Sequence, residues 1–378
     1  MQCACDDSIA SAPCALAESH VVAVAQSGSV GGLALVAGGA GATAWWTDDR
    51  GLFARPLDAG GGAAGPARRV GTGCSGGLAV ASVGRRVAVA CGTRADPQRG
   101  RDGSIAIAWA RPDGVLTRWQ VLDRSGVDTD GLALAARDGT LTVAWRDANG
   151  AHPEIWSADV VDDGERELGP RLLSSPSRSA GSPSAIAWAD RSVIAWAETW
   201  SDGAFDTRGE VLIDDGRGAA RPVAQTTFED PHPILLRRDP GLLVGFRDAR
   251  PRDKRPRFFL QRVDSLGQIA GDAVRVGRAD GPGGATLLPC AGGITVVAPR
   301  FYGRRDVLIG VHRLDAELGR ISGEHQLYEF GVTYAGATAA CVGSSVLILA
   351  AERTGDRDRA ARLVTTTLSC KDDDGSEP

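Results

Sequence analysis

Short runs of apolar residues recur along the chain, separated by turns rich in glycine and aspartate. Between residues 132 and 173, the run 132–136 leads into the turn Asp138-Gly139, and further runs follow at 141–145, 155–160 and 167–173. Short β-rich runs bounded by such turns are typical of β-hairpins. We find no convincing segment with the period of an amphipathic helix, so the pattern predicts a helix content near zero.

One turn marks a repeat along the chain. An aspartate followed closely by glycine recurs after a strand-like run, at Asp58, Asp113, Asp163, Asp215, Asp264 and Asp315. Successive aspartates in this series lie 55, 50, 52, 49 and 51 residues apart. A unit of this length is typical of a β-propeller blade, which contains four strands.

The units predict an all-β fold, a seven-bladed β-propeller of four-stranded blades. The innermost strands are expected to begin near Gly32, Gly77, Gly131, Ser184, Pro233, Gly284 and Ala335. The last unit holds only three strands before Cys370, and the segment 20–26, from His20 to Gln26, is predicted to supply its outer strand. Such closure by an N-terminal strand leaves only short, protected edges. We therefore expect a propeller over 20–370, a cysteine-containing tail over 1–19 and an acidic disordered tail over 371–378.

The later part of each unit resembles a repeat of secreted bacterial β-propeller proteins of largely unassigned function, which include distant sialidase-like and lipoprotein propellers. In that repeat an aromatic-Arg-Asp strand end precedes a variable loop and a strand reading Gln-Arg-Val-Asp-x-x-Gly. The copies here are Phe246-Arg247-Asp248 with the segment 261–267, His312-Arg313-Leu314-Asp315, and a looser copy at 53–58. The resemblance spans most of residues 30–370. It implies the fold and transfers no catalytic residue.

Composition restricts the classes of partner and compartment. The net charge of −5 predicts no attraction to nucleic acid, and no run of apolar residues is long enough for a transmembrane segment. Eight cysteines without a CxxC motif favour disulfides and an oxidising compartment. Lys254 and Lys371 are the only lysines, a bias that fits a GC-rich bacterial genome. We therefore expect a secreted, periplasmic or cell-surface bacterial protein, with a lipid anchor near Cys3 or Cys5 as one alternative.

Three disulfides are predicted from strand positions. Cys74 precedes the first strand of the second blade and Cys91 ends the next strand, so antiparallel pairing brings the two together. Cys370 ends the last strand and lies close to Cys14 if the segment 20–26 pairs beside it. Cys290 and Cys341 occupy matching turns of adjacent blades, and we predict that they pair as well.

Long charged loops join the second and third strands, and a propeller places these loops on one face. They span 48–50, 94–102, 146–147, 198–206, 247–253, 300–306 and 352–358. Arginine binds carboxylates and phosphates in a bidentate manner, which would make this a recognition face. Mutual ion pairing between the loops is the alternative. The candidate ligand-binding residues are Arg146, Trp200, His232, Arg247, Arg300, Tyr302 and Arg304.

Several candidates carry specific expectations. Trp200 is placed in a loop, where it would stack on a sugar, grip a partner or fold back over its blade. His232, between two prolines, is the best candidate for the channel rim. Tyr302 lies among arginines, yet a sialidase would also need an acid and three arginine clamps, and its Asp-box pattern fails at Ala54. We therefore expect no sialidase activity.

No cofactor is expected. Calcium is the one ion we consider, because Asp202, Asp206 and Glu210 cluster in one loop and residues 128–131 form another acidic turn. Neither segment matches an EF-hand loop, and Asx turns explain both without a metal.

The leading hypothesis for function is an exported, non-enzymatic binding scaffold. It would present its Arg- and Asp-rich loop face to a protein, a peptide or a glycan. The alternative is a glycan-active hydrolase or lyase with its site at the channel mouth. An enzyme should concentrate an acid, a base and arginines at that mouth, whereas a scaffold should present a broad face with exposed aromatic residues.

Overall fold

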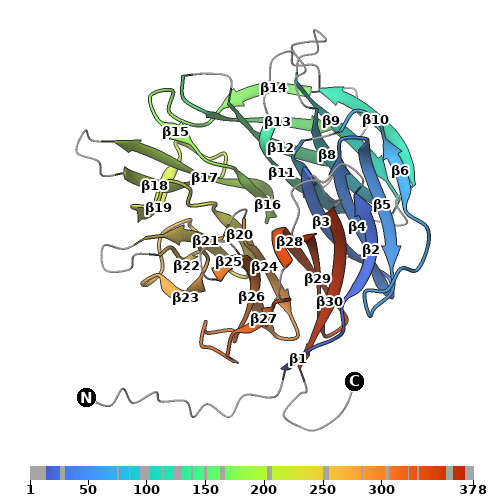
Figure 1. Ribbon diagram of the computed structural model, residues 1–378. Coiled ribbons are helices and arrows are strands. Elements are labelled where there is room, and N and C mark those ends of the chain that lie inside the picture. The colour runs from blue at the N-terminus through green and yellow to red at the C-terminus, as the bar shows by residue number, and fades with distance from the viewer. Residues whose placement is uncertain are drawn as a thin grey trace, which may run out of the picture.

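The computed structural model is a ring of small antiparallel sheets around a central channel (Figure 1). It describes residues 14–25, 30–74, 76–84, 86–93, 103–111, 115–122, 129–137, 139–148, 151–161, 167–201, 207–249, 255–281, 284–302, 306–321, 323–329, 332–354 and 361–370. Over these residues there is no helix, and hence none that could cross a bilayer. The predicted seven-bladed β-propeller is confirmed.

Blades 1 to 4 are each built from consecutive strands, counted outward from the channel. Blade 1 comprises β3 (Gly32–Gly38), β4 (Gly41–Asp48), β5 (Gly51–Leu57) and β6 (Arg68–Gly71). Blade 2 comprises β7 (Leu78–Val83), β8 (Arg86–Thr93), β9 (Ser104–Ala110) and β10 (Leu116–Leu122). Blade 3 comprises β11 (Thr129–Arg137), β12 (Thr140–Asp147), β13 (Glu154–Val161) and β14 (Glu167–Leu172). Blade 4 comprises β16 (Ser184–Trp188), β17 (Arg191–Ser201), β18 (Thr207–Asp214) and β19 (Arg221–Thr226), with β15 (Ser179–Ala180) beside β17.

Blades 5 to 7 complete the ring. Blade 5 comprises β20 (Ile234–Arg238), β21 (Gly241–Asp248), β22 (Arg257–Val263) and β23 (Val274–Arg278). Blade 6 comprises β24 (Thr286–Cys290), β25 (Gly293–Tyr302), β26 (Asp306–Leu314) and β27 (His325–Leu327). Blade 7 comprises β28 (Val332–Val342), β29 (Ser345–Thr354) and β30 (Ala361–Cys370), completed by β1 (Cys14–Leu16) and β2 (His20–Ala25).

The core lies between neighbouring blades. The second strand of each blade contributes much of this core, because both of its faces are covered by adjacent sheets. Every residue of β4 and β21, for example, is buried. Trp45, Trp145 and Trp196 are almost fully buried at the blade interfaces, where large aromatic side chains remove the most apolar surface from water. These three tryptophans therefore pack between blades.

The repeated aspartate is explained by hydrogen bonds within its turn. Asp264 Oδ1 accepts from the backbone N–H groups of Leu266, at 2.9 Å, and Gln268, at 2.8 Å. Asp315 Oδ1 accepts in the same way from Glu317 and Gly319. An aspartate that bonds to its own backbone stabilises the turn between the third and fourth strands. Asp113 and Asp163 of the predicted series lie outside the described residues.

Blade 7 joins the two ends of the chain, as Figure 1 shows by the blue β2 beside the red β30. β2 pairs antiparallel with β30, so that His20 lies opposite Thr365 and Ala25 opposite Ala361. The predicted closing strand therefore forms. The structure adds β1, which also pairs with β30 and lies within the segment predicted as a tail.

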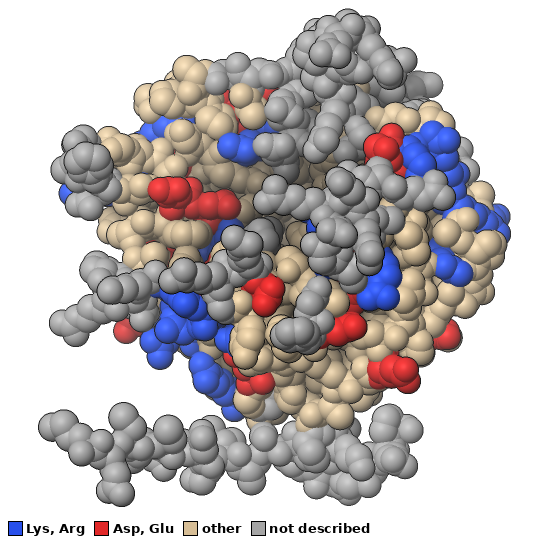
Figure 2. Space-filling view, viewed as in Figure 1, with Lys and Arg blue, Asp and Glu red and all other residues tan. Residues whose placement is uncertain are grey.

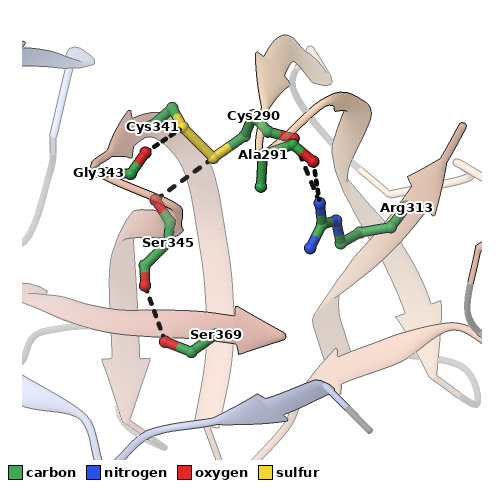
Figure 3. Close-up of a disulfide and its surroundings, with 7 residues drawn as sticks. All are labelled: Cys290, Ala291, Arg313, Cys341, Gly343, Ser345 and Ser369. Carbon is green, nitrogen blue, oxygen red and sulfur yellow. Dashed lines mark hydrogen bonds between the residues drawn. A yellow bond between two sulfur atoms is a disulfide. The ribbon is translucent and has the colours of Figure 1, made fainter. Parts of the chain in front are cut away.

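Three disulfides join the pairs expected from the sequence. Cys14–Cys370 links β1 to β30, Cys74–Cys91 lies in blade 2, and Cys290–Cys341 joins the innermost strands of blades 6 and 7 (Figure 3). The buried Arg313 donates to the carbonyl oxygens of Cys290, at 3.2 Å, and Ala291, at 3.4 Å, and so holds the turn that carries Cys290. One disulfide thus fastens the closing sheet of blade 7 within itself, and another ties that blade to blade 6.

Candidate functional site

The channel opens on the face where the second and third strands of each blade are joined, which we call the loop face. Its cavity has a volume of about 560 Å³ and is lined by the beginnings of the innermost strands of blades 1 to 6 and by the middle of β28 in blade 7. Most lining residues are glycine, alanine, leucine or other small or apolar types, with hydroxyl groups from Ser182, Ser184, Thr286 and Thr338. Among the described lining residues, His232 alone carries a titratable side chain.

His232 has an unusual backbone conformation. Its φ is 42°, in the left-handed region, although it is not glycine and precedes Pro233. A residue before proline normally adopts an extended conformation, so this one must be held by its surroundings. The preceding carbonyl, Pro231 O, accepts a hydrogen bond of 2.7 Å from the Arg247 backbone N–H, which ties the segment to β21. Strain of this kind concentrates at functional sites.

A polar cluster lies beside His232 at the channel mouth. His232 Nε2 is 2.5 Å from Asp230 Oδ2, and Arg247 Nη2 donates to the same oxygen at 3.1 Å. Arg247 Nη1 donates to Gly281 O at 2.8 Å, and its guanidinium lies over the Phe228 ring. Arg247 is buried, whereas 51% of the Asp230 side chain and 20% of the His232 side chain are exposed. Asp230 and His232 therefore face the solvent, and Arg247 supports them from below.

Arg146 joins this cluster from blade 3. Its Nε donates to Ala180 O at 2.9 Å, and its positive charge acts on Asp230. Burial alone would raise the pKa of Asp230, but the hydrogen bond from His232 and the charges of His232, Arg247 and Arg146 lower it. Burial lowers the pKa of Arg247, and Asp230 opposes that shift. Asp230 is thus an ionised acceptor under the influence of two guanidinium groups.

Most other charges of the loop face are paired with one another. In the view of Figure 2, basic and acidic side chains are interspersed around the ring, and neither sign forms a continuous surface. Second-strand residues and their partners pair as Asp48–Arg50 at 2.7 Å, Glu198–Arg178 at 3.5 Å, Arg247–Asp230 at 3.1 Å, Arg300–Glu324 at 2.9 Å and Glu352–Arg362 at 2.8 Å. Mutual pairing, the alternative reading of the charged loops, therefore holds at these five positions of the described part of the face.

The structure does not bring all the candidate residues together. Arg300 of β25 is buried against Glu324, which precedes β27 in the same blade, and a buried, paired guanidinium is not the open anion clamp considered above. Tyr302 is exposed and packs against Tyr328, with the ring centroids 4.9 Å apart. Arg304 lies outside the described residues. Only His232, Arg247 and Arg146 meet at the channel mouth, with Asp230 as the member that the sequence analysis did not select.

Trp200 is not in a loop. It lies in β17, opposite Arg208 of β18, and is half-buried. The Arg178 guanidinium lies 4.0 Å from the ring centroid, so part of the indole surface is covered. β17 extends past the expected loop start, and for this reason the indole is fixed on the edge of a blade rather than free.

The described residues provide no support for a calcium site. Asp202, Asp206 and the first residue of 128–131 lie outside the described residues. Within the described part of the chain, no group of three or more His, Cys, Asp or Glu side chains could hold a metal ion.

Comparison with known proteins identifies the fold and nothing finer. No family model matches the chain, and no curated protein matches it. The polysaccharide lyase Uly1 superposes with a TM-score of 0.52 at 8% identity, over 90% of this chain and 90% of that chain. Trypanosoma rangeli sialidase in complex with sialic acid matches with a TM-score of 0.49 at 11% identity, over 88% of this chain.

A subtype N10 neuraminidase-like protein of A/little yellow-shouldered bat/Guatemala matches with a TM-score of 0.48 at 10% identity, over 94% of this chain and 99% of that chain. The match covers 59% of the Trypanosoma rangeli sialidase, which is less than two thirds of its length. At these identities the similarity shows the β-propeller fold alone.

We expect no turnover of a fluorogenic sialoside. Tyr302 packs on Tyr328 and is not among the residues that line the channel. Tyr334 is almost fully buried, and burial together with Glu352 raises its pKa, the opposite of what a phenolate nucleophile requires. Hydrolysis of the sialoside that disappears in Tyr302→Phe or Tyr334→Phe would contradict this expectation.

Proposed function

We propose that the protein is a binding scaffold that holds an acidic glycan at the channel mouth on its loop face. The observation that carries this proposal is the cluster of His232, Asp230, Arg247 and Arg146 at the rim of an otherwise small and apolar channel. The charges of two guanidinium groups act on one carboxylate, so the cationic groups outnumber the anionic one. A sugar carboxylate would bond to Arg146 and His232, with Arg247 supporting them from below, and sugar hydroxyls would donate to Asp230.

The ligand class rests on two supports. The cavity is concave, with a few polar groups at its rim and hydroxyl groups within, the usual composition of a small-molecule site. Of the three solved structures compared above, the one with the highest TM-score is, by its name, a polysaccharide lyase. Polysaccharides are therefore the first ligands to try. Exposed aromatic residues on blade 6, Phe301, Tyr302 and Tyr328, give the same face the broader contact surface of a scaffold.

Binding of polygalacturonate, alginate or chondroitin sulfate to immobilised protein tests the proposal. We expect Arg146→Gln to weaken binding on the order of tenfold, and a rise in salt to weaken it further. His232→Asn should also weaken binding while keeping the backbone, because asparagine tolerates a positive φ. Arg137→Gln, on the opposite face, is the matched control. Salt-independent binding that both mouth variants retain would refute the proposal.

A catalytic role is the second candidate, and the Asp230–His232 contact favours it. A carboxylate 2.5 Å from an imidazole orients the ring for proton transfer. In a lyase reaction neutral His232 would take the proton from the carbon next to the sugar carboxylate, a C=C bond would form as the bond to the leaving oxygen breaks, and the proton would pass from the imidazole to that oxygen. A hydrolase would need a second carboxylate, which the described mouth cluster does not contain.

Turnover separates the two candidates. The scaffold proposal expects no unsaturated product from any of the three acidic polysaccharides, as measured by ultraviolet absorbance. Product formation that His232→Asn abolishes would replace the scaffold with a lyase.

A further inference from the structure

A second hollow opens away from the channel, on the side of blade 4 that adjoins blade 5. Its volume is about 350 Å³. It is lined by Trp200, Arg208, Gly209, Glu210, Gln225, Thr226, Thr227 and Asp248. This volume lies near the lower end of the range for small-molecule sites, about 300–1,000 Å³, and suits a single sugar ring rather than a larger ligand.

The aromatic wall of the hollow is held in place from outside. Arg178 lies 4.0 Å from the Trp200 ring centroid and does not line the hollow. Its guanidinium is fixed in turn by Glu210, at 3.1 Å, and Glu198, at 3.5 Å. Trp200 is therefore locked before any ligand arrives, and a preorganised ring loses little conformational entropy on binding.

The polar groups of the hollow are also arranged in advance. Asp248 Oδ1 accepts hydrogen bonds from Thr226 Oγ1, at 3.2 Å, and from the Thr227 backbone N–H, at 3.0 Å, which sets the orientation of the carboxylate. Gln225 is exposed and offers both an amide donor and a carbonyl acceptor. An aromatic face beside donors and acceptors complements a sugar ring, which has apolar C–H faces and hydroxyl edges.

The charges of the hollow select against an acidic ligand. Two carboxylates, Glu210 and Asp248, line it together with one guanidinium, that of Arg208. Carboxylates accept hydrogen bonds from hydroxyl groups but repel a ligand carboxylate or sulfate. This is the reverse of the channel mouth, where cationic groups are in excess.

We infer that the Trp200 hollow binds a neutral sugar ring, with the ring stacked on the indole and its hydroxyl groups bonded to Gln225 and Asp248. The inference takes glycans as the ligand class from the proposed function, but the site is separate. Arg247 and Asp248 are consecutive on β21, and successive side chains of a strand point to opposite faces. Arg247 therefore contacts the cluster at the channel mouth, whereas Asp248 lines the hollow.

The test measures binding of neutral and acidic glycans to the same set of variants. The neutral probes are galactomannan, xyloglucan and pullulan oligosaccharides, and the acidic probes are the three polysaccharides named above. Trp200→Ala and Gln225→Ala should each weaken binding of a neutral probe, Trp200→Ala on the order of tenfold. Trp200→Phe should retain more of it than Trp200→Ala, because it keeps an aromatic face. Leu266→Ala, which removes an exposed apolar side chain in the turn between β22 and β23 on the opposite face, is the matched control. Thermal unfolding verifies that each variant is folded.

The outcomes keep the two proposals apart. Neutral binding that depends on Trp200 and is indifferent to Arg146→Gln supports the hollow, even if no acidic glycan binds. Acidic binding that depends on Arg146, with no neutral probe bound, overturns the hollow and leaves the channel mouth in place. Neutral binding that a folded Trp200→Ala and a folded Gln225→Ala both retain overturns the hollow as well.

Discussion

A chain without residues 1–28 is expected to lose cooperative folding as a monomer. The deletion removes β1 and β2, which pair with β30 and complete blade 7. It also removes Val22 and Ala25, both fully buried, and half of the Cys14–Cys370 disulfide. β30 would then become an open edge, and a long exposed edge promotes association with other chains. Thermal unfolding by circular dichroism should show a broad transition or none, and size-exclusion chromatography should show aggregates.

A shorter deletion provides the control. Removal of residues 1–13 leaves β1, β2 and Cys14 in place, so this variant should unfold like the full chain. A monomeric protein without residues 1–28 that melts at the temperature of the full chain would show that the ring does not depend on its N-terminal strand.

The second large effect is expected from the closing disulfide. Cys14 and Cys370 are 356 residues apart, so their bond restricts the unfolded chain more than the Cys74–Cys91 bond, which spans 17 residues. Loop-closure entropy predicts a loss of about 6 kcal/mol for Cys14→Ser with Cys370→Ser, against about 3 kcal/mol for Cys74→Ser with Cys91→Ser. The free energy of unfolding from urea titrations measures both losses.

The relative size of the two losses in unfolding free energy shows whether chain entropy determines how much each disulfide stabilises the fold. Equal stability of the wild type and the variant without Cys14 and Cys370 would mean that strand pairing alone closes the ring. A larger loss at the short loop would mean that local packing around Cys74, which is fully buried, outweighs chain entropy.

The fold was predictable because it repeats. The turn aspartates mark each blade through hydrogen bonds within a few residues, and local interactions of this kind leave a spacing in the sequence. Ring closure followed from counting strands in the last unit. β1 escaped prediction because three residues beside β30 produce no hydrophobic pattern of their own.

The site was predictable only in part, because its members come from different blades. His232 stood out through its flanking prolines, and Asp230 was adjacent to it in the sequence. The pairing of Arg300 with Glu324 joins two strands of blade 6, and the cover that Arg178 gives Trp200 reaches β17 from the segment before β15. Such contacts depend on how strands are placed in space, so residue type and spacing could not distinguish an open arginine from a paired one.

The position of the chain ends has a consequence for orientation. β1 begins and β30 ends at the cross-strand pair Cys14–Cys370, at the end of blade 7 opposite the loop face. The first and last described residues, Cys14 and Cys370, therefore lie side by side. Figure 1 shows β1 at this end of the ring. A fusion partner, a surface or an affinity matrix can be attached before residue 14 or after residue 370. The attachment point then lies on the face opposite the loop face. The channel mouth and the Trp200 hollow then point away from the point of attachment, toward the surrounding medium.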